Sequence, residues 1–294
     1  MASPSASILP ALDAWIDRAR RHLLTAAPDL AGLVDDYAGE ARFGASVIAG
    51  DLSRAGASAH VLEVGAGAGL LSAALQAAGY RVTALEPLGA GFTHMARLRG
   101  LVDDYTGLEG LALERLDIGA ESLTSGQAFD LAFSINVMEH VGDVGAVLRG
   151  VWAALGPGAS YHFLCPNYRF PFEPHFGIPT LGTKALTWRV FERRILASPV
   201  VVDPAGTWAS LNWISVAQVR RLCRREFGVT PEFDRGVTYR FVQRALVDPS
   251  FQRRHGLALR TMARAADGLG LARLAFLVPP GAQPAMSCRI TRPR

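Results

Sequence analysis

The sequence predicts an α/β fold built on a doubly wound, mostly parallel sheet. Apolar runs and helical patterns alternate over residues 60–165, one run ends in a glycine-rich turn, and half of the 294 residues are hydrophobic. This alternation is typical of right-handed βαβ units, in which helices join parallel strands. A chain of this size can bury one large core, with or without a cap.

Five strands are expected in the alternating region. Each is a short apolar run that stops at or near a glycine, a proline, an acid or an asparagine, as buried parallel strands often do. The runs cover 61–64, 81–85, 111–115, 129–134 and 160–164. Helices are expected over 70–78 and about 143–155, and Gly156-Pro157-Gly158 is expected to form a turn.

The flanking segments are mainly helical in pattern. Apolar residues recur at helical spacing over 8–57, and Ser215 and Gln218 stand in capping-box spacing at the start of a helix that runs to Phe227. Residues 237–268 also have a helical pattern. Two further strands are expected over 271–278 and 285–291, forming a closing antiparallel hairpin at the edge of a seven-stranded sheet.

Composition limits the class of protein. Three widely spaced cysteines, with no CxxC, argue against a disulfide framework and favour a reducing cytoplasm. We expect no signal peptide and no membrane-spanning segment, because no long apolar run is present. Residues 1–183 carry 11 arginines and 19 acids, whereas 184–273 carry 16 basic residues and 7 acids. The basic segment predicts either an anionic ligand or membrane surface, or simply a solvated helical face.

The glycine-rich turn predicts a nucleotide-type ligand. Glu63-Val64-Gly65-Ala66-Gly67-Ala68-Gly69 ends a predicted strand and opens a helix. Glycines allow sharp turning and close approach of a ligand, and the helix start offers unpaired N–H groups. The dinucleotide fingerprint G-x-G-x-x-G/A does not fit, because Leu70 stands at the position of the third small residue. This mismatch weakens a nicotinamide or flavin interpretation.

The stretch VLEVGAGAGLLSAAL resembles motif I of the class I S-adenosylmethionine-dependent methyltransferases. Three further features follow in that family's order: Glu86 after the second strand, Asp117 after the third, and FDLAFSINVMEHV along the fourth. The last resembles the branch that contains ubiquinone-biosynthesis O-methyltransferases. The resemblance covers about residues 55–165.

The resemblance implies S-adenosyl-L-methionine as cofactor. It places an acid on the ribose hydroxyls, here Glu86, and an acid on the adenine amino group, here Asp117. Carboxylates can accept both kinds of hydrogen bond. The alternative is that each acid is an ordinary polar residue at the end of a strand, with no ligand role. The cofactor-binding residues so predicted are Glu63, Gly65, Ala66, Gly67, Gly69, Glu86, Asp117, Ile118 and Asn136.

Asn136, Glu139 and His140 form the predicted catalytic segment. Their i, i+3, i+4 spacing would bring them to one face of a helical turn. His140, with Glu139, is the predicted catalytic pair, and His140 could take a proton from an acceptor hydroxyl. In related enzymes a comparable E-x-x-E-H segment holds a divalent metal. Asn136 replaces the first Glu here, which should weaken such a site, so no metal is predicted, although His175 could complete one. A purely structural role also stays open.

The aromatic and proline-rich run 167–179 is a candidate wall of an acceptor pocket. Tyr168, Glu173 and His175 are its predicted substrate-side residues. A packed structural loop explains the run equally well. Trp188, Trp208 and Trp213 are expected in the core.

Four segments are therefore expected along the chain: N-terminal helices (1–57), the S-adenosylmethionine-binding core (58–165), an acceptor-side loop and helical region (166–270) and the closing hairpin (271–294).

The predicted activity is methyl transfer to a hydroxyl of a small or lipid-like anionic acceptor, with peripheral membrane contact as an option. The Asn-Pro-Pro-Tyr motif of amino-group methyltransferases is absent after the fourth strand. A macromolecular acceptor such as RNA, a nicotinamide-dependent oxidoreductase and a non-catalytic S-adenosylmethionine sensor are the alternatives. No stable nucleic-acid partner is predicted, because no RNA-binding module is recognisable.

Overall fold

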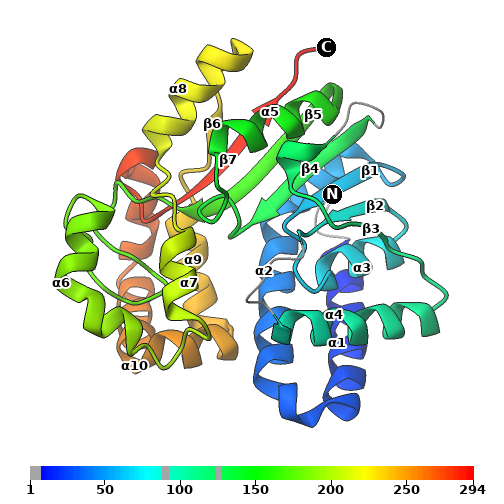
Figure 1. Cartoon of the computed structure of the whole chain (residues 1–294), viewed down its shortest axis with the longest axis horizontal. Coiled ribbons are helices and arrows are strands. Elements are labelled where there is room, and N and C mark those ends of the chain that lie inside the picture. Colours follow the sequence, from blue (N-terminus) through cyan, green and yellow to red (C-terminus); the bar gives the residue numbers. More distant parts are fainter. Residues whose placement is uncertain (1–7, 88–92, 124–127) are drawn as a thin grey trace. The chain divides into compact units, whose positions relative to one another are not determined.

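A computed structural model of the chain describes residues 8–87, 93–123 and 128–294, the side chains of 93–94 and 254–258 excepted. Helices and strands alternate through the first half of the chain, and helices dominate the second half (Figure 1). The α-helices are α1 (Leu9–Ala26), α2 (Ala31–Ala55), α3 (Leu70–Ala77), α4 (Thr93–Leu108), α5 (Val144–Ala154), α6 (Lys184–Leu196), α7 (Pro204–Ser210), α8 (Val216–Phe227), α9 (Val237–Val247) and α10 (Pro249–Gly268). Short 3₁₀ helices are η2 (Pro28–Leu30), η3 (Ala120–Ser122), η4 (Leu271–Leu277) and η5 (Pro280–Ala282).

The strands form one seven-stranded sheet of order β3-β2-β1-β4-β5-β7-β6. They are β1 (His60–Val64), β2 (Arg81–Leu85), β3 (Glu114–Leu116), β4 (Phe129–Ile135), β5 (Leu155–Pro166), β6 (Glu232–Phe233) and β7 (Ala285–Thr291). β1 pairs in parallel with β2 and β4, and β2 with β3, whereas β6 and β7 are antiparallel. The order reverses direction at β1, so the carboxyl end of β1 is the point where this class of sheet binds ligands. The predicted doubly wound, mostly parallel sheet is confirmed.

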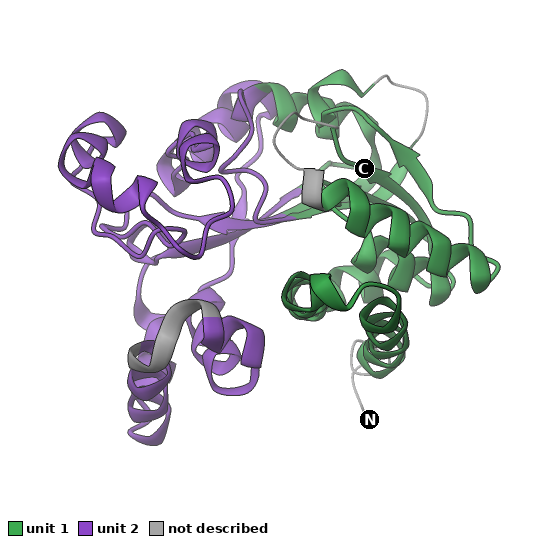
Figure 2. Cartoon of the chain, turned by 60° about the horizontal axis from the view of Figure 1, so that its bottom comes forward, with its two compact units in different colours: residues 1–134, 146–162, 291–294 green, residues 135–145, 163–290 purple. Residues whose placement is uncertain are grey.

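The described residues fall into two compact units (Figure 2). Unit 1 comprises residues 1–134, 146–162 and 291–294, and unit 2 comprises residues 135–145 and 163–290. The four-segment division predicted from the sequence stays a proposal, because it follows the chain rather than its contacts.

Unit 1 contains the parallel strands and the helices that cover them. The buried face of α1, which includes Leu12, Trp15 and Ile16, follows the helical spacing seen in the sequence. α1 packs against α2, α3 and α4, and Figure 1 shows α5 on the opposite side of the strands from α1, α2 and α4. β1 is buried along its whole length because helices cover both faces of the sheet.

Unit 2 consists mainly of helices and of the antiparallel pair β6–β7. α8 begins as predicted, with the Ser215 side chain accepting a hydrogen bond from the Gln218 backbone N–H at 3.3 Å. α9 and α10 pack together around a small core that contains Ala245, Phe251 and Ala263. No helix among the described residues has the length and apolarity needed to cross a membrane.

Two local predictions were wrong. Residues 271–277 form the 3₁₀ helix η4 instead of a strand, and the antiparallel partner of β7 is β6, which the sequence analysis did not identify. An apolar run of this length does not distinguish a strand from a helix, and Gly270, at φ +70°, reverses the chain immediately before it. Gly156-Pro157-Gly158 does not form a separate turn but lies within β5, where Gly158 N donates to Arg292 O at 3.0 Å.

Replacing Ser215 by Ala should lower the free energy of unfolding by about 1 kcal/mol, because the N-terminus of α8 loses its side-chain acceptor. Denaturant unfolding measures this change. Ser215→Asp, which restores an acceptor at the same position, should return most of the loss. Equal stability of the Ala and Ser forms would show that the cap contributes nothing.

Candidate functional site

The β1–α3 turn is built from glycines with left-handed backbone angles. Gly65, Gly67 and Gly69 have φ of +74°, +54° and +79°, which L side chains rarely adopt. The amides of Gly65 and Ala66 both donate to Leu85 O at 2.8 Å, at the end of β2. The turn is therefore fixed to the neighbouring strand, and it places the start of α3 at the carboxyl edge of the sheet.

Glu86 follows β2 directly and reaches back to this turn. Its Oε2 accepts a hydrogen bond from Gly67 N at 2.7 Å. Burial raises the pKa of Glu86, whereas the Gly67 hydrogen bond and the charges of Arg99 and Arg115 oppose that rise. The Gly67 contact orients the carboxylate, which has further lone pairs for a ligand.

Glu63, in β1, lies behind the turn. It is buried, and its carboxyl group accepts a short hydrogen bond from the Ser72 hydroxyl in α3. Burial raises the pKa of Glu63 to about 8, against the opposing effects of the Ser72 hydrogen bond and the charge of Arg115. Glu63 joins β1 to α3 through this hydrogen bond.

An arginine that the sequence analysis missed lies close to the turn. Arg115, in β3, donates to Ala68 O at 2.9 Å and pairs with Asp103 at 2.6 Å. Its guanidinium also lies where a Cβ at Gly69 would stand, which adds to the demand for glycine that the φ of +79° already makes. No motif marks Arg115, because its role depends on the pairing of β3 beside β2.

Asp117 and Ile118 follow β3, as predicted, and Ile118 is half-buried. Asp117 is exposed, and its carboxylate pairs with Arg99 of α4 at 2.7 Å. Arg99 thus forms an ion pair with Asp117, and its positive charge also opposes the rise in the pKa of Glu86. An adenine amino group would have to share Asp117 with this arginine.

The N-terminal helices and α4 also reach the turn. A Cβ built on Gly67 would lie 3.4 Å from Tyr37 Cε1 and 3.8 Å from the end of Met95. Tyr37 and Met95 therefore border the same space as the Gly67 backbone. Neither carries a sequence signal for this role.

In unit 2, the segment after β4 is a turn and not the helical turn expected from the sequence. Asn136 has φ +56°, outside the right-handed helical region, and its N–H donates to Leu164 O at 2.8 Å. His140 N then donates to Val137 O at 2.8 Å. Asn136 therefore does not share a helix face with Glu139 and His140, because its left-handed backbone breaks the helical register.

Asn212 holds this turn in place. Its Nδ2 donates to Met138 O at 2.7 Å and to Val141 O at 2.9 Å, and its N–H donates to Glu139 O at 2.8 Å. The next residue, Trp213, has the unusual φ of +59°. The sequence analysis missed Asn212, because a single asparagine in a loop carries no pattern.

The turn brings Glu139 and His140 next to His175. One ligand atom from each of the three lies within 4.8 Å of the others, and the two imidazole rings meet edge to face at 5.1 Å. Glu139 is buried, and both histidines are partly buried. Three potential ligands for a metal ion or a proton thus converge in unit 2.

Hydrogen bonds define which ring nitrogen of each histidine carries the proton. Ser210 donates its hydroxyl proton to Thr207 O, so its oxygen accepts from His140 Nδ1–H at 2.8 Å. His175 Nδ1–H donates to Glu173 Oε1 at 2.6 Å. In the neutral rings, Nε2 of each histidine therefore carries the lone pair.

Glu173 is the centre of a buried hydrogen-bond network. Its carboxylate accepts from the Tyr168 hydroxyl at 3.2 Å, from the ring and backbone of His175, and from Phe176 N. Burial alone would raise the pKa of Glu173, but the bonds from His175 and Phe176 outweigh it and lower the pKa. Glu173 is therefore a carboxylate that orients His175, in the manner of residues that support metal-ligating histidines.

Aromatic rings pack around this network. Tyr168 stacks on Trp213 with ring centres 4.4 Å apart, and Trp208 contacts Trp213, Trp188 and Phe176. Trp208 is buried, whereas Trp188 and Trp213 are partly buried. Burial, and next the charge of Glu173, raise the pKa of Tyr168, so its hydroxyl stays protonated as a donor. The 167–179 run is thus a packed loop that presents polar groups.

Comparison with known proteins supports the chemistry of the glycine turn. A family model described as a methyltransferase domain matches residues 62–161. The uncharacterized protein Rv1509 of Mycobacterium tuberculosis is 43% identical over 284 residues, 96% of this chain and 95% of that protein. A ubiquinone biosynthesis O-methyltransferase of Bordetella avium is 30% identical over 181 residues, 61% of this chain and 65% of that protein.

Among solved structures, a Haemonchus contortus phosphoethanolamine N-methyltransferase 2 in complex with S-adenosyl-L-methionine matches with a TM-score of 0.50. The match covers 94% of this chain and 60% of that one, at 12% identity, so it shows the shared fold.

His140 should titrate near pH 4. Burial, and next the charge of His175, lower its pKa to about 4, so the ring should stay neutral from pH 7 down to pH 5. NMR titration of the imidazole signals, with His140→Gln for assignment, measures this value. A midpoint near the ordinary 6.5 would contradict the buried arrangement described here.

Proposed function

Because the chain belongs to the family of S-adenosylmethionine-dependent methyltransferases, we propose that it methylates an oxygen of a small or lipid-like acceptor. The observation that carries the cofactor part of this proposal is the 2.7 Å hydrogen bond between Gly67 N and Glu86 Oε2. It joins a glycine turn and an oriented carboxylate at the carboxyl ends of two adjacent parallel strands. That pair suits an adenosyl ligand.

The residues of unit 1 fit the cofactor. Gly67 has a positive φ, and a Cβ at this position would already touch Tyr37 and Met95, so a side chain there would occupy the space beside the turn. Gly65, Ala66, Gly67 and Gly69 would supply backbone surface, and Glu86 would accept from ribose hydroxyls. Asp117 and Ile118 would lie along the adenine. Glu63 would hold the turn in place through its hydrogen bond with Ser72. The role of Asn136 stays a proposal within unit 2.

The cofactor supplies an electrophilic methyl group on a sulfonium sulfur. The chain's task is then to hold the acceptor in line and, where the acceptor is a hydroxyl, to take its proton. The geometry of His140 suits this, because Nδ1–H is fixed by Ser210 and Nε2 carries a lone pair, and the ring is neutral at pH 7. Its lowered pKa makes it a weak base, so positioning has to supply most of the effect. Glu139 would stabilise the ring after it has taken the proton. Tyr168, Glu173 and His175 would contact or orient the acceptor.

An anionic or lipid-like acceptor fits the basic second half of the chain. Residues 184–273 include 16 basic residues and only 7 acids. The three cysteines are free and buried, which suits a reducing cytoplasm. Screening cell extract for acceptors with labelled cofactor would test the activity. Release of S-adenosylhomocysteine with an acceptor would support it, and failure to bind S-adenosylhomocysteine would overturn it.

A second candidate is metal-assisted methylation. Glu139, His140 and His175 each bring one potential metal-ligand atom to the same place. Glu173 orients His175 through the hydrogen bond to its Nδ1. Two imidazoles and a carboxylate match the donor set of zinc and other transition metals better than the all-oxygen set of magnesium. Such an ion would bind the acceptor oxygen and lower its pKa, and His140 would then serve as a ligand and not as a base.

Replacing Glu86 by Ala should weaken binding of S-adenosylhomocysteine at least tenfold, about 1.4 kcal/mol, because the ribose loses its acceptor. Calorimetry measures the affinity. Glu192→Ala, at an exposed position of α6, is the matched control and should bind normally. Unchanged affinity in Glu86→Ala would remove the ribose role, whereas no binding to the wild type would remove the methyltransferase proposal itself.

Binding of Zn²⁺ or Mn²⁺ distinguishes the two candidate mechanisms. Equilibrium dialysis should give about one ion per chain if the three residues are ligands, and His175→Gln should reduce the affinity tenfold or more. His22→Gln, in unit 1, is the control. Equal weak binding by all three proteins would reject the metal and leave His140 as the base.

A further inference from the structure

A ridge of exposed leucines runs along η4. In a 3₁₀ helix, side chains three residues apart stand in line, so Leu271, Leu274 and Leu277 form one row. They are 50%, 53% and 76% exposed, and Leu269, just before them, is 72% exposed. Exposed leucines are ordinary singly, but a contiguous row of them marks an interaction surface.

The ridge is held firmly on its support. Ala272 and Ala275, on another side of η4, are buried. The Phe276 ring lies tilted against Tyr239 of α9 with ring centres 5.5 Å apart, and a Cβ on Gly236 would lie 2.8 Å from the Phe276 ring. The leucines therefore face away from the packed side of η4.

Exposed apolar side chains concentrate in unit 2. Of the fifteen large apolar side chains that are exposed among the described residues, only Leu108 lies in unit 1. Unit 2 is also the basic unit, with 18 basic and 10 acidic residues, against 12 and 16 in unit 1. Apolar exposure and positive charge thus occur together.

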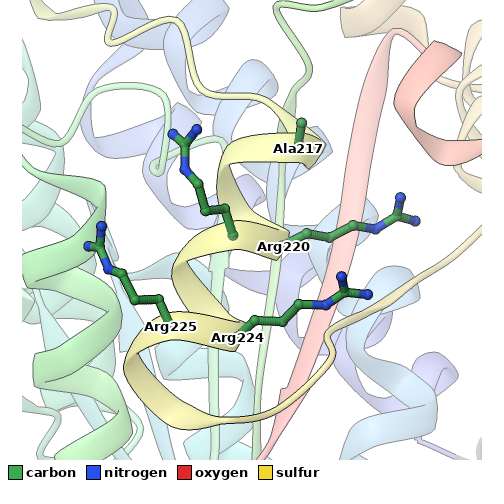
Figure 3. Close-up of a pocket in the computed structure, with 5 residues that line it drawn as sticks. Ala217, Arg220, Arg224 and Arg225 are labelled. Carbon is green, nitrogen blue, oxygen red and sulfur yellow. The ribbon is translucent and has the colours of Figure 1, made fainter.

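α8 carries four exposed arginines, Arg220, Arg221, Arg224 and Arg225. With Ala217 they lie along the open surface of this helix. Figure 3 shows Arg220 and Arg224 extending to one side of the helix and Arg225 to the other. η5, which begins three residues after Leu277, packs against α8, so the ridge and the arginine helix belong to adjoining parts of unit 2.

We propose that unit 2 binds the surface of an anionic lipid bilayer, with the leucines of η4 inserted below the headgroups and the α8 arginines on lipid phosphates. Leucines gain by leaving water at the acyl boundary, and arginines near an anionic leaflet each add to the attraction. A nucleic acid would bind the arginines through its phosphates but would leave the exposed leucines in water. A second copy of the chain would bring two positively charged units together.

Sedimentation with lipid vesicles tests this proposal without cofactor or acceptor, so its outcome is independent of the enzymatic proposal. The wild type should sediment with vesicles of phosphatidylcholine and phosphatidylglycerol, far less with phosphatidylcholine alone, and less as salt is added. The triple variant Leu271→Ser, Leu274→Ser, Leu277→Ser should bind at least about tenfold more weakly. Leu108→Ser, equally exposed in unit 1, is the matched control and should bind as the wild type does.

Arg221→Gln with Arg224→Gln should weaken binding and reduce its salt dependence, whereas Arg21→Gln with Arg81→Gln in unit 1 should not. Thermal unfolding checks that the variants fold, and the single variant Leu277→Ser serves if the triple variant does not. No binding of the wild type to the anionic vesicles would overturn the proposal. Binding of the leucine variants at the wild-type level would also overturn it. A third contradicting result would be a wild-type dimer in solution that the leucine substitutions dissociate while sedimentation with vesicles stays unchanged.

Discussion

The hydrogen bond between Gly67 N and the Glu86 carboxylate is the contact on which the proposed cofactor site depends. It exists because β1 and β2 pair in parallel with Val64 opposite Leu85, so the residues that follow each strand meet at one edge. Only glycine tolerates the backbone angle of Gly67 without strain. The carboxylate fixes the turn through this bond, and under our proposal it also accepts from the ribose of the cofactor.

A different kind of constraint shapes unit 2. There, polar groups are buried and must be satisfied by one another. Asn212 binds three backbone groups of the 138–141 turn, and Glu173 accepts four hydrogen bonds from Tyr168, His175 and Phe176. These bonds fix the tautomer of His175 and place it beside His140. The chemistry of the pair is set by this surrounding network more than by the histidines themselves.

Sequence reasoning succeeded where structure follows from local pattern. The glycine turn, the acid after β2 and the cap of α8 are all defined by neighbours in the chain. It failed where an apolar run could adopt two structures, as at 271–277, and where the roles depend on distant contacts. Arg115 acts on Gly69 through strand pairing, Asn212 holds a turn about seventy residues earlier, and Tyr37 reaches the glycine turn from a helix that no motif marks. The spacing of Asn136, Glu139 and His140 also misled, because a left-handed residue breaks their helical register.

A crystal structure with S-adenosylhomocysteine would test the central claim most directly. The account predicts the ligand along the 65–69 turn, with both ribose hydroxyls within hydrogen-bond distance of the Glu86 carboxylate while Gly67 N still holds Oε2. A ligand bound elsewhere, or a ribose that makes no contact with Glu86, would contradict it.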